Sequence, residues 1–310
     1  MPFQAASVMD TTTAKTILVT GGAGFIGSHL IEALLKEGNS KVISLDNYFT
    51  GSEKNHHPGA TYLRGETKDI ETLLTERPDV IYHLGEYSRV LTSFDDIPLV
   101  WRLNAQGTFA VLEYCRKNSV RLIYAGSSTK FGEFDDKVDG QDQTPYAYFK
   151  ATNTNLVNNY GAWYGLDYAI TYFYNVYGGR ELTDGKYATL IGIFSRKYRD
   201  GEPLTVVSPG TQLRAFTHVE DTVRGLMLVG EQGKGDGYCI GNGTEYSILE
   251  IAELFGGEIQ MLPARKGDRN YSKIDPTRMR GLGWAPSIDV KSHIAKFKES
   301  VPERSKEPAR

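Results

Sequence analysis

The stretch Thr20-Gly-Gly-Ala-Gly-Phe-Ile-Gly27 decides the fold of this 310-residue chain. Before it, Lys15 to Thr20 form an apolar run without a polar face, which is typical of a buried parallel strand. After it, His29 to Lys36 have the pattern of a helix that stops at Gly38. The glycines, spaced G-x-x-G-x-x-G, therefore form a turn between a strand and a helix, where a bare backbone can approach a phosphate group.

Further apolar runs alternate with helical segments along the chain. We expect strands at 41–46, 79–84, 121–125 and 167–173, and helices at 98–117 and 146–164. Such alternation forms β-α-β units with right-handed crossovers. The sequence therefore predicts an α/β protein with a Rossmann-type doubly wound parallel sheet at 15–175 and a smaller C-terminal lobe at 176–310. Part of 215–242 is expected to return to the first domain, and residues 1–14 to form a disordered tail.

The composition is that of an ordinary globular protein, with 40% hydrophobic and 24% charged residues. A net charge of −3 gives no electrostatic reason to expect nucleic acid or an anionic membrane as a partner. No apolar run is long enough to span a membrane, and the N-terminus lacks a signal-peptide pattern. Cys115 and Cys239 lie far apart in apolar contexts, so we expect no disulfide, no metal site and a reducing, cytoplasmic setting.

A carboxylate, Asp46, ends the second predicted strand, about twenty residues after the glycine turn. At this position it can accept hydrogen bonds from the hydroxyl groups of a ribose. It would repel a 2′-phosphate, which favours NAD over NADP. The alternative is a tight turn followed by an incidental aspartate. The spacing and the strand–turn–helix context favour the cofactor site.

Tyr146 and Lys150 lie one turn apart on the same face of a predicted helix. A nearby ammonium favours the phenolate form of a tyrosine, which makes the phenol a usable base. Taken alone, such a pair is most often a solvated surface pair. Ser127 changes the interpretation, because it follows the fourth predicted strand, at the edge where open α/β sheets bind ligands. We predict that Ser127, Tyr146 and Lys150 form a catalytic set.

These motifs, together with His83-Leu-Gly85, Asn104 and Asn175-Val-Tyr-Gly178, resemble those of the extended short-chain dehydrogenases/reductases. Residues 15–290 are most similar to the NAD-dependent sugar-nucleotide epimerase/dehydratase family. The resemblance implies that Tyr146 removes a proton from a sugar hydroxyl while hydride passes to the nicotinamide. Lys150 would hold the nicotinamide ribose, and Ser127 would orient the oxygen. The implied NAD contacts are Gly21, Gly24, Phe25, Ile26, Gly27, Asp46, Asn47, Glu66, Thr67, Leu84, Gly85, Asn104, Tyr146 and Lys150.

The resemblance also implies a nucleotide-sugar site. Arginines suit its diphosphate because a guanidinium binds two phosphate oxygens at once, although a surface ion pair is the alternative for each. The chain has Glu86-Tyr87-Ser88-Arg89 where the family has small residues lining the sugar pocket, which leaves the identity of the sugar open. The residues implied in substrate binding are Glu86, Tyr87, Ser128, Asn175, Arg214, Arg265 and Asp268.

The residues after Ser127 indicate the type of reaction. In the family's 4,6-dehydratases an Asp-Glu pair follows the hydroxyl residue, and the decarboxylases keep a glutamate there, whereas this chain has Ser128-Thr129-Lys130. Because the acid and base for elimination are missing, we predict epimerisation, closest to the UDP-hexose 4-epimerases. The family also implies a homodimer formed through the two long helices. Alternatives are an epimerase acting at C2, C3 or C5, a ketosugar reductase, and a non-catalytic NAD-binding module.

Overall fold

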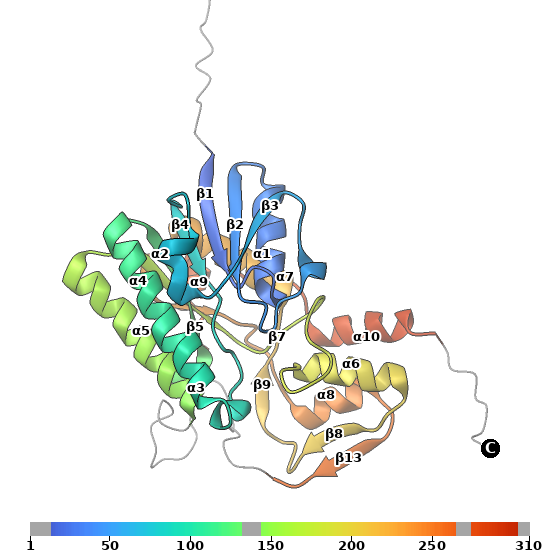
Figure 1. Ribbon diagram of the computed structural model, residues 1–310. Coiled ribbons are helices and arrows are strands. Elements are labelled where there is room, and N and C mark those ends of the chain that lie inside the picture. The colour runs from blue at the N-terminus through green and yellow to red at the C-terminus, as the bar shows by residue number, and fades with distance from the viewer. Residues whose placement is uncertain (1–13, 132–143, 265–273, 303–310) are drawn as a thin grey trace, which may run out of the picture.

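The core of the protein is a parallel β-sheet of seven strands (Figure 1). The computed structural model describes residues 14–131, 144–264 and 274–302. The strands follow the order β11-β6-β5-β4-β1-β2-β3, and all neighbours are parallel. The predicted Rossmann-type sheet is confirmed. Its strands are β1 (Lys15–Thr20), β2 (Ser40–Asp46), β3 (Ala60–Arg64), β4 (Val80–His83), β5 (Arg121–Ser127), β6 (Tyr168–Phe173) and β11 (Gly235–Ile240).

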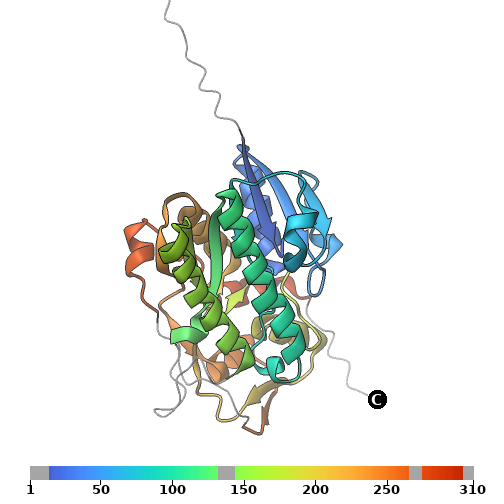
Figure 2. The ribbon, with the colours of Figure 1, turned by 60° about the vertical axis from the view of Figure 1, so that its left-hand side comes forward.

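Helices cover both faces of this sheet, which explains why its central strands lack a polar face. Successive side chains of a strand point to opposite faces. Leu18 accordingly joins one apolar core, whereas Ile17 and Val19 join the core on the other face. Figure 2 shows two of the covering helices, α4 and α5, side by side. The helices are α1 (Phe25–Lys36) and α7 (Val219–Gln232) on one face, and α2 (Ile70–Leu73), α4 (Gly107–Asn118) and α5 (Pro145–Tyr164) on the other.

The segment predicted as one helix at 98–117 is divided in the structure. α3 (Ile97–Val100) is followed by a π-helical turn, η4 (Trp101–Gln106), and only then by α4. Asn104 is fully buried in this turn, where its side-chain amide binds the N–H of Tyr87 at 2.7 Å and the C=O of Tyr87 at 3.1 Å. Such widened turns are frequent at functional sites. Apolar periodicity did not predict it, because the pattern on either side of the turn is still helical.

The C-terminal part of the chain forms a smaller lobe with its own apolar core, which includes Phe194, Val206, Phe255 and Ile294. Figure 1 shows this lobe beneath the carboxyl ends of the sheet strands. Between α6 and α8 the chain returns to the first domain, where α7 packs on α1 and β11 pairs with β6. The elements of the lobe are α6 (Leu190–Asp200), β8 (Leu204–Val207), α8 (Ile248–Phe255), β13 (Ile259–Leu262) and α10 (Val290–Ser300).

Short elements complete the described chain. Two-stranded ladders join β8 to β13, β7 (Val176–Tyr177) to β10 (Thr217–His218), and β9 (Leu213–Ala215) to β12 (Glu245–Ser247). The remaining helical turns are η1 (Glu53–Asn55), η2 (Thr67–Asp69), η3 (Leu91–Phe94), η5 (Ser128–Phe131) and α9 (Thr277–Gly281). In the ranges that the structure describes, every helix is too short or too polar to cross a membrane.

Candidate active site

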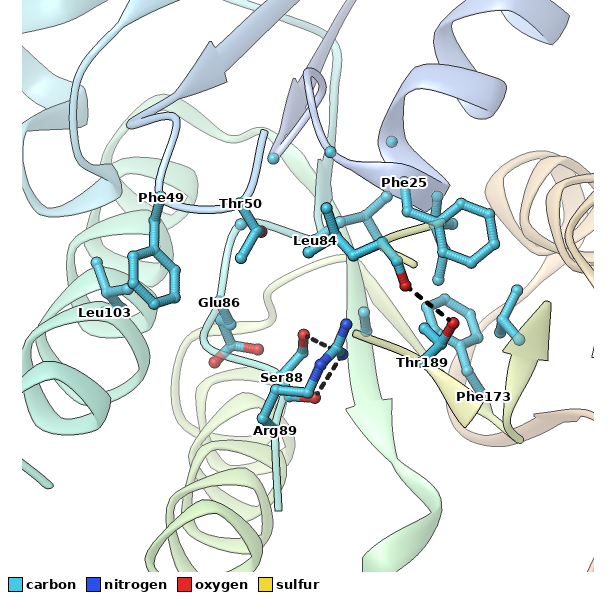
Figure 3. A pocket seen from close by; sticks show the side chains of 18 of the residues that line it. Phe25, Phe49, Thr50, Leu84, Glu86, Ser88, Arg89, Leu103, Phe173 and Thr189 are labelled. Atoms are coloured by element: carbon cyan, nitrogen blue, oxygen red, sulfur yellow. Dashed lines mark hydrogen bonds between the residues drawn. The ribbon is translucent and has the colours of Figure 1, made fainter. Parts of the chain in front are cut away.

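A cavity of about 500 Å³ lies between the carboxyl ends of the sheet strands and the smaller lobe. Its wall comes from the segments after β1, β2, β4 and β5 and from the start of α6. In Figure 3, Glu86, Ser88 and Arg89 lie together on one side of this space, and Phe25 and Thr189 lie on another. The cavity therefore occupies the position at which open parallel sheets bind ligands.

The glycine turn before α1 is shaped by close backbone contacts. Gly21 has a φ of +72°, and a Cβ there would lie 2.9 Å from the Cα of Gly85. A Cβ on Gly27 would collide with the carbonyl oxygen of Gly21. α1 begins here without a side-chain cap or an acidic residue in its first turn. The free N–H groups and the helix dipole therefore favour an anion, such as a pyrophosphate, at this end of the cavity.

Asp46 ends β2 beside the glycine turn. Its Oδ2 accepts the N–H of Ala23 at 2.9 Å, and its Oδ1 accepts the N–H of Tyr48 at 2.7 Å. Burial raises the pKa of Asp46 above its ordinary value, although both N–H bonds oppose the rise. Each carboxylate oxygen keeps a lone pair for a ribose hydroxyl. The bare backbone of the turn and this fixed carboxylate thus fit the pyrophosphate and a ribose of NAD.

Ser127, Tyr146 and Lys150 all line the same cavity. Ser127 ends β5, and its Oγ accepts hydrogen bonds from the N–H and the hydroxyl of Thr129, at 3.2 and 2.9 Å. Because both lone pairs are used, the Ser127 hydroxyl is left to donate to a ligand. The hydroxyl of Thr144 caps α5, so that Tyr146 lies in the first turn and Lys150 one turn later. The helix start thus presents phenol and ammonium to the cavity together.

Glu86 reaches Lys150, although the sequence predicted that it lines a sugar pocket. Its Oε2 pairs with the Nζ of Lys150, and the exposed fractions of the two side chains are 1% and 6%. Lys150 gives a second hydrogen bond to the carbonyl oxygen of Ala125 at 2.6 Å. The Oε1 of Glu86 accepts hydrogen bonds from Thr108 Oγ1 at 2.8 Å, Asn153 Nδ2 at 2.9 Å and Tyr124 OH at 3.2 Å.

A buried histidine connects this network to the glycine turn. The Oγ1 of Thr20 accepts the N–H groups of Leu84 and Gly85, so its own hydroxyl donates to Nδ1 of His83 at 2.7 Å. Nε2 of His83 therefore carries the proton and donates to Thr108 at 3.1 Å. Complete burial lowers the pKa of His83 to about 4, so the ring is neutral at neutral pH. The chain of donors ends on the Glu86 carboxylate.

Tyr87 turns away from the cavity, so the prediction that it contacts the sugar is not supported. It is 1% exposed, and its hydroxyl donates to Asp96 at 2.8 Å. Asp96 also binds Lys186 at 2.8 Å and the hydroxyl of Tyr187 at 3.0 Å, both from the smaller lobe. Arg89 donates from Nε to the carbonyl oxygen of Tyr187 at 2.7 Å. This segment ties the two lobes together beside the cavity.

Most of the predicted site residues do lie on the cavity wall. They come from segments far apart in the sequence, which the sheet edge gathers around one space. Those on the wall are Gly21, Gly24, Phe25, Ile26, Gly27, Asp46, Asn47, Thr67, Leu84, Gly85, Glu86, Ser127, Ser128, Tyr146, Lys150 and Asn175.

Other predicted residues lie elsewhere. Glu66 forms ion pairs with a lysine and an arginine and is not part of the described wall. Asn104 is buried behind the wall, because its amide holds the backbone of the loop after β4. Arg214 is buried in β9, also away from the wall. Arg265 and Asp268 fall outside the described residues, so their contacts with substrate stay predictions.

Sequence reasoning missed the hydrogen-bond network that ends on Glu86. Its members Thr20, His83, Thr108 and Asn153 had no predicted polar role, although His83 belongs to a motif of the resemblance. One signal was present: His83 is a polar residue at the end of an otherwise apolar strand. Another was Asn153, which lies one turn after Lys150 on the buried side of α5. Neither signal identifies the hydrogen-bond partner of the residue until the fold is known.

A family model described as the NAD-dependent epimerase/dehydratase family matches residues 17–241. The chain belongs to this family. Its UDP-glucose 4-epimerase relative from Mycolicibacterium smegmatis is 32% identical over 305 residues, which cover 91% of this chain and 97% of that one. UDP-glucuronic acid decarboxylase 6 of Arabidopsis thaliana is 31% identical over 309 residues, which cover 91% of this chain and 88% of that one.

Solved structures of the NAD-dependent epimerase/dehydratase family agree with the fold. The UDP-glucose 4-epimerase of Thermotoga maritima, solved with UDP-glucose, has a TM-score of 0.84 and 27% identity, and covers 93% of this chain and 100% of its own. Membership of the family confirms NAD as the cofactor and sugar-nucleotide chemistry as the class of activity. Because an epimerase and a decarboxylase are similar to the chain to nearly the same degree, at 32% and 31% identity, membership does not determine which reaction it performs.

Proposed function

We propose that the chain epimerises a UDP-linked hexose at C4. The observation that carries the proposal is which carboxylates lie on the cavity wall around Ser127, Tyr146 and Lys150, and what those carboxylates bind. Among the wall residues that the structure describes, the carboxylates are Asp46, at the end of β2, and Glu86, which pairs with Lys150. Elimination needs an acid and a base beside the substrate, and both carboxylates are engaged elsewhere. Reversible oxidation of one hydroxyl needs a base and a hydrogen-bond donor, which are present, and NAD as the hydride acceptor.

Each residue of the catalytic set has its own proposed role in this reaction. Ser127 donates its hydroxyl proton in a hydrogen bond to the sugar oxygen. Tyr146, as phenolate, takes the proton of the sugar hydroxyl and later returns it. Lys150 keeps one N–H for the cofactor ribose, since its other two are used by Glu86 and Ala125. NAD, held by the glycine turn and Asp46, supplies the hydride acceptor and donor.

The nucleotide of the substrate is proposed to extend towards the smaller lobe. Ser128 and Asn175 line the cavity on that side, and Asn175 is fixed by a hydrogen bond from its Nδ2 to the carbonyl oxygen of Ala215 at 2.9 Å. Arg265 and Asp268 are proposed to bind the nucleotide part of the substrate, and so is Arg214, although β9 holds it away from the described wall. The family relatives that bind UDP-sugars support a UDP-linked substrate.

The experiment is to incubate the purified protein with UDP-glucose or UDP-galactose in deuterated water, to separate the two C4 isomers by chromatography and to measure the mass of each. We expect the other C4 isomer, without deuterium on carbon, because hydride is returned inside one site. Deuterium on carbon would overturn the proposal in favour of epimerisation through an enolate. Net consumption of added NADH with a ketosugar would indicate a reductase. Absence of turnover, with NAD bound, would indicate a non-catalytic module.

We also propose a homodimer formed through the α4–α5 face. Most of the large apolar side chains that the described chain leaves exposed lie on or beside these helices, at 47% to 60% exposure. Large apolar side chains left exposed on the same group of helices are typical of an interface. Light scattering on a sizing column should give twice the mass of one 34.5 kDa chain. A monomer at assay concentration would contradict the proposal. The residues are Phe94, Ile97, Trp101, Phe109, Tyr148, Trp163 and Tyr164.

A further inference from the structure

Glu86 brings a full negative charge to the catalytic set. Its carboxylate and the ammonium of Lys150 are both nearly inaccessible to water, so little solvent screens their attraction. Removing one partner of such a pair leaves the other charge buried and unpaired. The position and the effective charge of Lys150 therefore depend on Glu86.

The pair is held from several sides. Oε1 of Glu86 accepts hydrogen bonds from Thr108 on α4, Asn153 on α5 and Tyr124 on β5, while Oε2 faces Lys150. A carboxylate with this many donors has little capacity left for a sugar hydroxyl. Lys150 is satisfied on two of its three N–H groups, and the third remains for a ligand.

Among the described titratable groups that face the pair, Glu86 is the one whose negative charge balances the positive charge of Lys150. Tyr146 shares α5 with Lys150, Tyr124 faces the pair from β5, His83 faces it from β4, and Arg89 lies on the same loop. Burial lowers the pKa of His83 to about 4 and raises the pKa of Tyr124 well above its ordinary value. Both are therefore neutral at neutral pH, and Arg89 is a cation like Lys150.

We propose that Glu86 is a positioning residue of the reaction: it directs the free N–H of Lys150 to the cofactor ribose and offsets part of the charge with which Lys150 favours the Tyr146 phenolate. A phenolate that is stabilised less strongly is a stronger base for the sugar hydroxyl. The inference rests on the proposed redox roles of Tyr146 and Lys150, but it does not depend on which carbon of the sugar reacts.

The test compares Glu86→Gln and Glu86→Asp with the wild type, loaded with NAD. Glutamine keeps the size and the acceptor oxygen but removes the charge and turns an N–H donor towards the ammonium. Asp221→Asn is the matched control. Asp221 is also a buried carboxylate, 1% exposed, but it holds the backbone of Ser287 and Ile288 away from the cavity. The readouts are bound NAD, melting temperature, KM, kcat and its pH profile, and the reduction of bound NAD by UDP-hexose, followed by absorbance.

For Glu86→Gln we expect kcat to fall about 10- to 100-fold, the size of one lost hydrogen bond to a charged group, while KM stays within about 3-fold. The acid limb of the pH profile should move to lower pH, because Lys150 then acts with its full charge. Glu86→Asp keeps the charge, so it should lower kcat without moving the acid limb. Asp221→Asn should lower the melting temperature and leave kcat and the pH profile unchanged.

Three outcomes would overturn the inference. A raised KM with unchanged kcat in Glu86→Gln would mean that Glu86 contacts the sugar, as the sequence predicted. An unmoved pH profile would mean a purely structural role. If Glu86→Gln does not fold, Glu86→Asp decides instead: an acid limb that moves although the charge is kept, or an unchanged kcat, would overturn the inference. Oxidation of the sugar nucleotide without epimerisation would refute the proposed function alone, because the variants can still be compared on NAD reduction. Absence of oxidation in the wild type would refute both.

Discussion

The cofactor end and the reaction end of the cavity are built from different kinds of contact. At the cofactor end, the glycine turn meets neighbouring backbone, and Gly21 approaches Gly85 with no side chain between them. At the reaction end, Glu86 meets Lys150 across 64 residues of sequence and is held by donors from two further elements. One end is a shape made by the backbone, and the other is a network of buried side chains. They should therefore fail in different ways when a residue is changed.

Tyr146→Phe should remove catalysis at the reaction end and leave NAD binding at the cofactor end intact. The variant loses one oxygen atom and keeps the ring, so bound NAD should be unchanged. We expect kcat to fall about 10²- to 10⁴-fold, the usual contribution of a general base. Turnover measured beside the NAD content of the purified protein tests this.

Tyr198→Phe is the control for the tyrosine variant. Tyr198 lies on α6 in the smaller lobe and is not part of the described cavity wall. Its variant should keep wild-type turnover. If Tyr146→Phe kept turnover within about 10-fold of the wild type, Tyr146 would not be the base.

His83 joins the two ends, since it links Thr20 beside the glycine turn to Thr108 beside Glu86. Its folded-state pKa of about 4 lies below the 6.5 of an unfolded histidine, so below pH 6.5 the unfolded chain binds a proton that the folded chain excludes. The free energy of unfolding should therefore fall as pH drops from 6.5 to about 4, by about 3 kcal/mol, and then level off. Urea unfolding at several pH values tests this.

His83→Gln should remove that dependence, because glutamine does not titrate and can still donate to Thr108. As pH falls from 6.5 to about 4, the free energy of unfolding of the wild type should approach that of the variant. Contributions from other titrating groups cancel in the difference. His56→Gln is the control, since His56 is exposed. A constant difference between wild type and His83→Gln from neutral pH to pH 4 would show that the buried ring does not resist protonation.

The contrast between a shape made by the local backbone and a network of distant side chains explains how much the sequence could predict. The glycine spacing, Asp46 and the Tyr146–Lys150 pair are local patterns, and the structure brings all of them to one cavity. The partner of Glu86 could not be predicted, because no pattern relates residues 86 and 150 until α5 packs beside β5. Tyr87 was assigned to the sugar pocket for its position in the motif, yet Asn104 and Asp96 hold it behind the wall. The π-helical turn that places Asn104 has no signal in the apolar periodicity.

Gly27→Ala should weaken NAD binding at the cofactor end and leave the catalytic residues of the reaction end in place. The new methyl group would meet the carbonyl oxygen of Gly21, which is backbone that cannot rotate away. We expect the unfolding free energy to fall by about 1–3 kcal/mol, the usual range for overpacking, and bound NAD to be lost. Gly281→Ala is the control, because a Cβ there meets nothing within 4 Å. If excess NAD restored wild-type kcat to Gly27→Ala, the damage would be confined to the cofactor end, whereas a lasting loss would mean that the two ends are coupled through Thr20 and His83.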